Sequence, residues 1–316
     1  MSAQNYWQQL PENILLGFEQ GSLYALVALG YTLVYGVLQL INFAHSEVFM
    51  TGGFGSWLVV NGIVGNRHLS GIAVPLTVIV GMLSGAVFGA AIAWLLEKTA
   101  YKSLRIRNAP KIAFLISAIG FSFFLSNLAG KLFDHLSNNP FPSYFNTTTH
   151  FLIDTKYFKI KPFDVVIIAA AIAMMIFLDQ LVNRTKMGRG IRAVAEDAPT
   201  AALMGIDIDK TISRTFVIGG ALAGAAGFMY GTAFGVAFNM GFAPGIKAFA
   251  AAVLGGIGNI RGAMMGGLLL GEVEVLVSAS PYIGAQWRDV VSFVVLVGVL
   301  IFRPTGILGE RLGRAA

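Results

Sequence analysis

The chain has 316 residues, of which 56% are hydrophobic and only 12% are charged. Soluble domains carry about 25% charged residues, so this composition excludes an ordinary soluble protein and indicates that lipid surrounds most of the chain. The net charge of +6 does not indicate nucleic-acid binding, because the basic residues cluster beside hydrophobic runs, where they mark cytoplasmic loops. The absence of cysteine excludes disulfides, thiolate catalysis and cysteine metal sites. Residues 1–13 lack the basic region with which a cleaved signal peptide starts.

Long continuous apolar runs predict an all-α, polytopic membrane protein, since the runs do not alternate as the strands of a membrane barrel do. We expect one membrane domain, residues 1–316, with eight or nine transmembrane helices. The expected spans are 14–29, a broken span from 32 to about 64, 75–96, 112–129, 163–181, 215–238, a short run at 248–258, 262–278 and 290–302. In the third span Gly81, Gly85 and Gly89 recur every four residues, which predicts a helix face that a neighbouring helix approaches closely.

Three basic segments, 97–111, 183–214 and 303–316, are expected on the cytoplasmic side. All three lie inside only if the N-terminus is outside and the number of crossings is odd. This favours nine crossings, in which 248–258 crosses, over eight, in which it re-enters. Residues 130–162 are then an outside loop, rich in Asn, Pro, Thr and aromatic residues, that could carry a short hairpin.

The segment from Thr32 to Phe54 reads TLVYGVLQLINFAHSEVFMTGGF and has polar residues in the middle of an apolar run. These residues are Asn42, His45, Ser46 and Glu47. A charged group at membrane depth costs roughly 2.5–3.5 kcal/mol even on the lenient insertion scale, and usually faces a bundle interior or a water-filled path. We therefore predict a broken helix near 42–47 that lines a route for a polar solute. The alternative is a patch at the membrane interface, where His and Glu reach water.

A metal site is not expected, because the four histidines of the chain form no ligand pair at helical spacing.

The run GGIGNIRGAMMGGLLLG, residues 255–271, is the second polar interruption. It is not a dinucleotide fingerprint, because Arg261 replaces the third glycine and no βαβ pattern surrounds it. It predicts a half-helix that ends at 255–258, turns at Asn259 and restarts at Gly262. Glu272 and Glu274 follow, and their side chains point about 200° apart around a helix. We assign Glu272 to the path, which leaves the other to pair with an arginine or lie near an interface.

The cytoplasmic segment 183–214 holds the third candidate site. Asp197 is expected to cap a short helix whose first turn contains Pro199. A solvated loop would not need the apolar run that follows, so the segment is expected to dock on a partner protein; lying against the membrane is the alternative. The candidate contact residues are Arg192, Glu196, Asp197, Ala201, Ala202, Leu203, Met204 and Gly205. The pattern GxxxxGK[ST] is absent, so ATP binding of the Walker type would need a separate subunit.

Five segments together resemble the permease subunits of bacterial ABC importers for branched-chain amino acids, in particular the H-type subunit. They are GSLYALVALGYTLVYGVLQLINFAHSEVFMTGGF (21–54), RAVAEDAPTAALMGID (192–207), TFVIGGALAGAAGFMYG (215–231), KAFAAAVLGGIGNIRGAMMGGLLLGEVE (247–274) and FRPTGILGE (302–310). The resemblance implies a multi-pass subunit of the bacterial inner membrane without a cofactor. It also implies three kinds of partner: a related second permease, two cytoplasmic ABC ATPases and a periplasmic substrate-binding protein. Residues 192–205 would then form the coupling helix that contacts an ATPase.

The mechanism that this resemblance implies is alternating access driven by the ATPases. A zwitterionic amino acid needs polar groups for its two ends and an apolar wall for its side chain. Asn42, His45 and Asn259 could supply the polar groups. Phe43, Val48 and Phe49 could supply the wall, and Glu47 and Glu272 complete the predicted path.

Two other functions fit the same residues. A stand-alone transporter could couple protons through Glu19, Glu47, Glu272 and Glu274, and a permease for urea or another small polar solute could use the same path. An intramembrane enzyme is disfavoured, because the sequence contains no recognisable nucleophile–base pair.

Overall fold

The computed structural model describes residues 3–65, 73–133, 140–141, 153–155 and 158–309. Its longer helices are α2 (Leu10–Leu38), α3 (His45–Val64), α4 (Ala73–Leu96), α6 (Lys111–Leu132), α7 (Pro162–Arg184), α10 (Ile208–Phe234), α11 (Phe242–Gly255), α12 (Ile260–Ala279) and α13 (Arg288–Phe302). The shorter ones are α1 (Ala3–Gln8), the π-helical turn η1 (Glu97–Tyr101), α5 (Lys102–Ile106), α8 (Lys186–Glu196), α9 (Ala198–Leu203) and the 3₁₀ turn η2 (Ala285–Trp287).

Eight helices among the described residues are long and apolar enough to cross a membrane. They comprise α2, α3, the continuous helix from α4 through η1 to α5, α6, α7, α10, α12, and the helix formed by η2 and α13. The predicted all-α, multi-pass membrane protein is confirmed. The short run expected at 248–258 is α11, which has 14 residues and measures about 21 Å at 1.5 Å per residue. It is not among the eight, so the preferred count of nine requires α11 to cross as a short helix.

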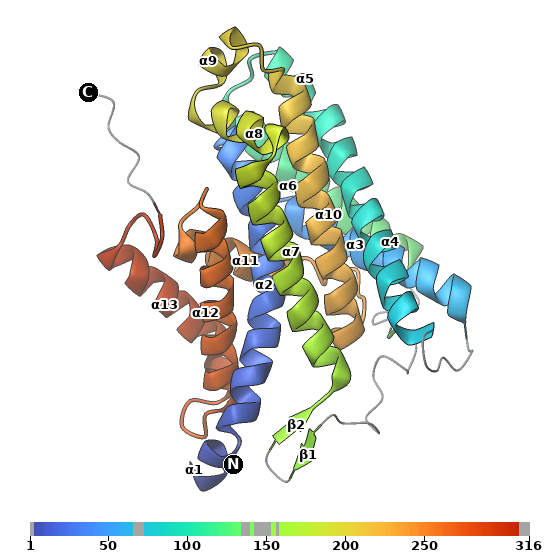
Figure 1. Ribbon diagram of the computed structural model, residues 1–316, viewed down its shortest axis with the longest axis vertical. Coiled ribbons are helices and arrows are strands. Elements are labelled where there is room, and N and C mark those ends of the chain that lie inside the picture. The colour runs from blue at the N-terminus through green and yellow to red at the C-terminus, as the bar shows by residue number, and fades with distance from the viewer. Residues whose placement is uncertain (1–2, 66–72, 134–139, 142–152, 156–157, 310–316) are drawn as a thin grey trace. The chain divides into compact units, whose positions relative to one another are not determined.

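The expected outside loop contains the two strands found among the described residues, β1 (Ile153–Thr155) and β2 (Phe158–Ile160). They pair antiparallel, with Ile153 opposite Ile160 and Thr155 opposite Phe158. Figure 1 shows this hairpin just before α7. The short hairpin that the sequence allowed in this loop is therefore present.

The chain divides into two compact units. Unit 1 comprises Met1–Thr32, Thr147–Met175 and Lys247–Ala316, and unit 2 comprises Leu33–Asn146 and Ile176–Ile246. Three helices, α2, α7 and α11, continue from one unit into the other. The expected single membrane domain stays a prediction, and each unit is described by itself.

Unit 2 is built on a junction where α3, α4 and α10 meet through glycines. A Cβ added at Gly224 would lie 2.0 Å from the carbonyl oxygen of Gly85, and one added at Gly52 would lie 2.2 Å from the Cα of Gly224. One turn further along the same faces, a Cβ at Gly89 would lie 2.2 Å from the carbonyl oxygen of Gly220. The close helix approach predicted from the glycine spacing in α4 is therefore confirmed, and α10 is the neighbour.

Unit 1 packs its helices in the same way, with α2 antiparallel to α12. A Cβ added at Gly271 would lie 2.2 Å from the backbone nitrogen of Gly21, and one added at Gly267 would meet the backbone of Ala25 at 2.5 Å. The helices α11 and α12 form a tight hairpin, since a Cβ at Gly255 would lie 1.9 Å from the carbonyl oxygen of Gly262. α13 packs beside α12 (Figure 1).

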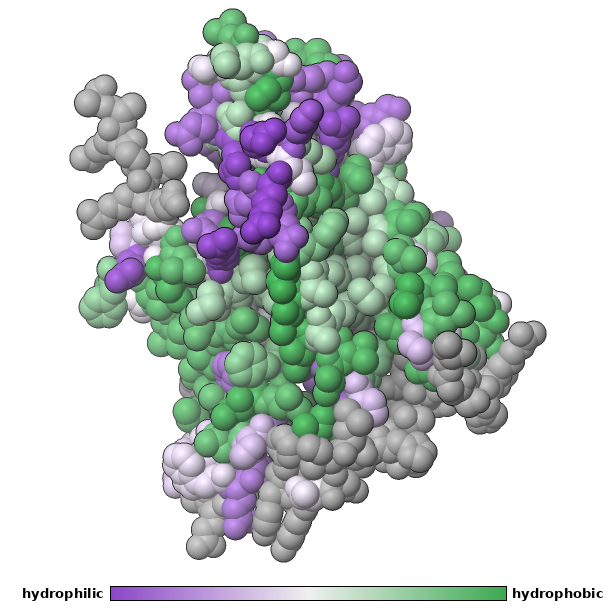
Figure 2. Space-filling model, viewed as in Figure 1, coloured by the Kyte–Doolittle hydropathy of each residue, from purple (hydrophilic) through white to green (hydrophobic). Residues whose placement is uncertain are grey.

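The surface of unit 2 changes character along its length. One face of α4 exposes apolar side chains, among them Leu76, Leu83 and Val87, which are 60–66% exposed. Figure 2 shows hydrophobic residues over α4 and hydrophilic residues gathered around α8. This distribution is the one expected of a membrane-embedded helix bundle with one solvated end.

Candidate functional site

The break between α2 and α3 is an ordered turn. After α2, Gln39 adopts a positive φ of 51°, and α3 begins at His45. Asn42 closes the turn, because its Oδ1 accepts hydrogen bonds from the backbone nitrogen of Ala44 at 3.1 Å and from the hydroxyl of Tyr101 at 3.2 Å. Asn42 is only 3% exposed. The broken helix predicted near 42–47 is confirmed. Tyr101, which the sequence did not single out, contacts this break from another helix.

Glu47 lies in the first turn of α3 and is buried. Its Oε1 accepts a hydrogen bond from the hydroxyl of Ser122 on α6 at 3.3 Å. Among the described residues none donates a hydrogen bond to its second oxygen, Oε2. The carboxyl group lies against Gly241, where an added Cβ would come within 2.7 Å of Oε2. A buried carboxyl group with one oxygen left over is the kind of group that membrane proteins keep for a function.

The other predicted members of the path in unit 2 differ in their surroundings. Val48 and Phe49 belong to the core, and the Phe49 ring packs edge-on against Tyr230 with centroids 5.5 Å apart. His45 is buried, whereas Phe43 is half-buried. Contact of these four side chains with a transported solute stays a prediction.

Asn259 and Glu272 belong to unit 1, whereas residues 42–49 belong to unit 2. Asn259 caps α12, since its Oδ1 accepts from the backbone nitrogen of Gly262 at 3.0 Å and its Nδ2 donates to the carbonyl oxygen of Leu308 at 2.8 Å. The half-buried Glu272 lies against Gly17, where an added Cβ would be 2.5 Å from its Oε2. The predicted turn at Asn259 is confirmed, and both of its side-chain hydrogen bonds hold the backbone.

Unit 1 also contains an ion network that the sequence did not reveal. Glu274, 1% exposed, forms ion pairs with Lys247 on α11 and, at 3.3 Å, with the Nε of Arg288 on α13. Lys247 also pairs with Asp289 at 2.8 Å, and the hydroxyl of Tyr24 on α2 donates to Glu274 at 2.8 Å. Two positive and two negative charges thus neutralise one another. Of the two neighbouring glutamates, Glu274 is the one that pairs with an arginine.

The helices α8 and α9 form the candidate site that the sequence predicts on the cytoplasmic side, here called the α8–α9 block (residues 186–203). Arg192 holds α8 to the end of α7 by donating from Nη1 to the carbonyl oxygen of Val182 at 3.0 Å and to Oδ1 of Asn183 at 2.7 Å. Thr185 caps α8 by accepting from the backbone nitrogen of Gly188 at 3.0 Å. These contacts fix the block to the helix that precedes it.

Asp197 caps α9, and Pro199 lies in the first turn, as the sequence predicted. Hydrogen bonds from the side chain and the backbone of Thr200 lower the pKa of Asp197, so the cap is ionised at neutral pH. Ala201 faces inward, whereas Leu203 and Met204 are 88% and 79% exposed. Of the remaining predicted contact residues, Glu196, Ala202 and Gly205 are also exposed. Figure 2 shows hydrophobic atoms at the tip where α9 lies, beyond the hydrophilic residues around α8.

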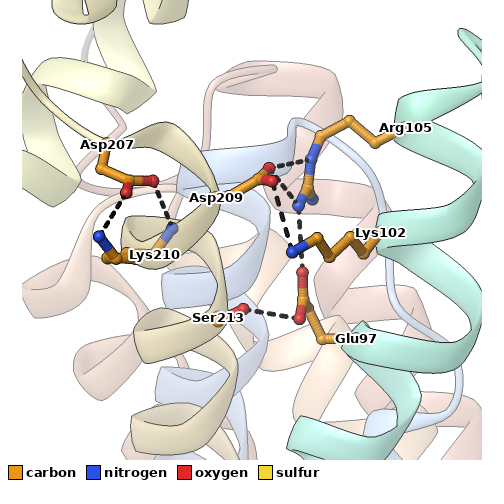
Figure 3. Close-up of polar contacts among 7 residues, drawn as sticks. All are labelled: Glu97, Lys102, Arg105, Asp207, Asp209, Lys210 and Ser213. Atoms are coloured by element: carbon orange, nitrogen blue, oxygen red, sulfur yellow. Dashed lines mark hydrogen bonds and ion pairs between the residues drawn. The ribbon is translucent and has the colours of Figure 1, made fainter.

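A second ion network joins the start of α10 to the helix that extends α4 (Figure 3). Arg105 donates from Nε and Nη2 to Oδ1 of Asp209, at 3.0 and 2.7 Å, and from Nη2 to Oε1 of Glu97 at 3.1 Å. Lys102 lies 3.7 Å from Oδ2 of Asp209. The hydroxyl of Ser213 donates to the other oxygen of Glu97 at 2.6 Å. Glu97, 1% exposed, is thus held from both helices.

Residues 13–300 match the family described as the permease component of the branched-chain amino acid transport system. The chain belongs to this permease family.

Relatives of the same family match nearly end to end. The chain is 42% identical over 298 residues to the high-affinity branched-chain amino acid transport system permease protein LivH of Salmonella typhimurium, which covers 93% of this chain and 94% of that protein. It is also 42% identical, over 299 residues, to LivH of Escherichia coli, with the same shares covered. It is 39% identical over 313 residues to the corresponding protein BraD of Pseudomonas aeruginosa, covering 97% of this chain and 96% of BraD. No solved structure matches the chain.

The features of this permease that sequence reasoning missed are the two ion networks and the contact of Tyr101 with Asn42. Their partners lie far apart in the chain, for example 104 residues between Arg105 and Asp209 and 250 between Tyr24 and Glu274. The sequence contained one signal for these ion networks, namely the charged residues at the edges of apolar spans.

Proposed function

We propose that this chain is a permease subunit of an ATP-driven importer for branched-chain or other hydrophobic amino acids in the bacterial inner membrane. The observation that carries the proposal is its similarity, over more than nine-tenths of its length, to permease proteins named for branched-chain amino acid transport. The family described for residues 13–300 agrees with that reading.

We propose three kinds of partner: a related second permease, two cytoplasmic ATPases and a periplasmic binding protein that delivers the substrate. The need for separate ATPases is supported by the absence of a GxxxxGK[ST] pattern from the sequence. The α8–α9 block is the proposed ATPase contact. Its support is the pair of exposed apolar side chains at the end of α9, Leu203 and Met204. The cap of α9 and the hydrogen bonds that hold α8 to α7 are both ordered.

The proposed topology has the N-terminus outside and the C-terminus in the cytoplasm. It is supported by contacts within unit 1 at the turn between α11 and α12. The backbone nitrogens of Ile307 and Leu308 donate to the carbonyl oxygens of Leu254 and Gly255, at 2.9 and 3.0 Å. The chain after α13 therefore lies at the same level as the end of α11. Because that part of the chain is basic and assigned to the cytoplasm, α11 would return the chain to the cytoplasmic side despite its length.

The proposed route for the substrate passes the break between α2 and α3. Support comes from the buried Asn42 and Glu47, which bring an amide and a carboxyl group to a helix break in an apolar run. Glu47 would attract the ammonium group of an amino acid through its Oε2, which accepts no hydrogen bond from the described residues. The part of Asn259 and Glu272 in the same route is proposed from the sequence alone.

The test is a pull-down of the chain from its native membrane in mild detergent, followed by mass spectrometry and by uptake of radiolabelled leucine. We expect two P-loop ATPases and a second permease to co-purify, and leucine uptake to require ATP. Recovery of the chain alone, together with uptake that follows a pH gradient without ATP, would instead establish the proton-coupled transporter. Uptake of urea but not of leucine would establish the small-solute permease.

A further inference from the structure

The start of α10 is joined to the α8–α9 block by a short, hydrogen-bonded connection. Between the two, Gly205 turns the chain with a φ of 84°, and the backbone nitrogen of Ile206 donates to the carbonyl oxygen of Ala201 at 3.0 Å. Asp207 then caps α10 by accepting from the backbone nitrogen of Lys210 at 3.0 Å. With both joints held by hydrogen bonds, a displacement of the block reaches Asp209 and Ser213 in the first two turns of α10.

The ion network of Figure 3 joins the start of α10 to a second helix and would carry such a displacement to it. Arg105 joins Asp209 of α10 to Glu97, and Ser213 holds Glu97 from the other side. A guanidinium group that binds two carboxylates has a fixed planar geometry, so it transmits position better than a single flexible ion pair. Glu97 is buried, so its ion pair with Arg105 is poorly screened by salt.

Glu97 is also the first residue of η1, the single π-helical turn between α4 and α5. π-helical turns within α-helices occur frequently at functional sites. The last residue of this turn is Tyr101, which is fully buried and packs against Phe114 and Phe216. Its hydroxyl donates to Oδ1 of Asn42 in the break between α2 and α3.

We infer that η1 relays motion of the α8–α9 block to the break between α2 and α3, with Arg105 as the input and Tyr101 as the output. Neither residue belongs to the proposed ATPase contact or to the proposed path, so both are positioning residues. All contacts in this series lie within unit 2. The inference rests on the proposed function, because it supposes that an ATPase moves the block.

The decisive experiment measures how much leucine is transported per ATP hydrolysed and compares variants of this chain with the wild type. Each variant is purified as the complete complex with its ATPases and reconstituted with the binding protein. Tyr101→Phe removes only the output hydroxyl and keeps the packed ring, and Arg105→Gln removes the input. The matched control is Lys210→Gln, which breaks the ion pair with Asp207 on the same turn of α10 without affecting the link to Glu97. Thermal unfolding of each complex shows whether the variants fold.

We expect Tyr101→Phe and Arg105→Gln to hydrolyse ATP within about twofold of the wild type while transport per ATP falls by roughly 5-fold or more, the low end of typical coupling between sites. The control should behave as the wild type. Because both residues act in one series, the double variant should lose no more than the worse single variant. Unaltered coupling in Tyr101→Phe, or losses that multiply in the double variant, would overturn the relay. Should the wild-type complex itself show no ATP-dependent leucine uptake, the proposed function would be wrong instead.

Discussion

At the scale of single residues, glycines decide how closely the helices of unit 2 approach. We predict that Gly224→Ala destabilises the protein by about 1–3 kcal/mol, the usual cost of overpacking. The reason is that the added Cβ would lie 2.0 Å from a backbone oxygen of Gly85, which cannot move as a side-chain end could. Thermal unfolding in detergent measures the effect. Gly120→Ala on α6 is the matched control, because nothing lies within 4 Å of its added Cβ. Equal melting temperatures for the two variants would contradict the prediction.

The ion network of unit 1 leads to a prediction of a different kind. Removing one partner from a buried ion pair leaves the other charge uncompensated and costs roughly 3–5 kcal/mol. We therefore expect Lys247→Met to lower the melting temperature strongly, because it deprives the buried Glu274 of its nearest cation. The double variant Lys247→Met, Glu274→Met should recover most of the loss, since Arg288 and Asp289 still pair with each other. A double variant less stable than the single one would show that the network is held by more than charge balance.

At the scale of elements, Asn259 joins the start of α12 to the chain after α13 through one side chain. Its Oδ1 caps α12 and its Nδ2 holds the chain after α13. We predict that Asn259→Ala speeds hydrogen exchange at both places, with a loss of about 1 kcal/mol for the cap. Asn259→Ser keeps a capping oxygen but is too short to reach Leu308, so exchange should rise only around residues 306–308. Hydrogen exchange with mass spectrometry measures the protection of both places in each variant. Equal protection of the start of α12 in the two variants would contradict the role of Oδ1 as the cap.

Features that depend only on neighbouring residues in the chain were predictable from the sequence. The apolar spans, the break near 42–47 and the cap at Asp197 depend on hydropathy and on side chains within a few residues of one another. The helix of α4 is the main exception, because it continues through the basic segment as η1 and α5 up to Ile106. Lys, Arg and Glu are strong helix formers, so a basic segment outside the hydrophobic run need not end the helix.

Contacts between elements distant in the chain were not predictable in the same way. Charged residues such as Arg105 and Asp209 carry no local sign of their partner, because 104 residues separate them and only packing of α5 beside α10 brings them together. The candidate path likewise has a part that the sequence predicted and a part that it did not. Its position at a helix break was predicted from the sequence, whereas the hydrogen bond of Asn42 with Tyr101 became visible only in the folded structure.

At the scale of the whole molecule, the side of the membrane that each loop faces depends on whether the short helix α11 crosses. If it crosses, the loop between α12 and α13 faces outside; if it re-enters, that loop faces the cytoplasm. Tyr282 in this loop is 84% exposed, and the chain has no cysteine of its own. Single cysteines can therefore be introduced and labelled from one side with a membrane-impermeant maleimide.

We predict that Tyr282→Cys is labelled in intact spheroplasts, whereas Leu203→Cys at the tip of the α8–α9 block is labelled only after the membrane is permeabilised. Leu203 is the matched control, because it is equally accessible and precedes α11, so its side does not depend on whether that helix crosses. We expect α11 to cross because the chain after α13 is basic, which assigns it to the cytoplasmic side. This part of the chain is hydrogen-bonded to the end of α11, so the turn between α11 and α12 should lie on the cytoplasmic side as well. Labelling of Tyr282→Cys only after permeabilisation would mean that α11 re-enters, that the chain crosses eight times, and that the basic C-terminal segment faces outside.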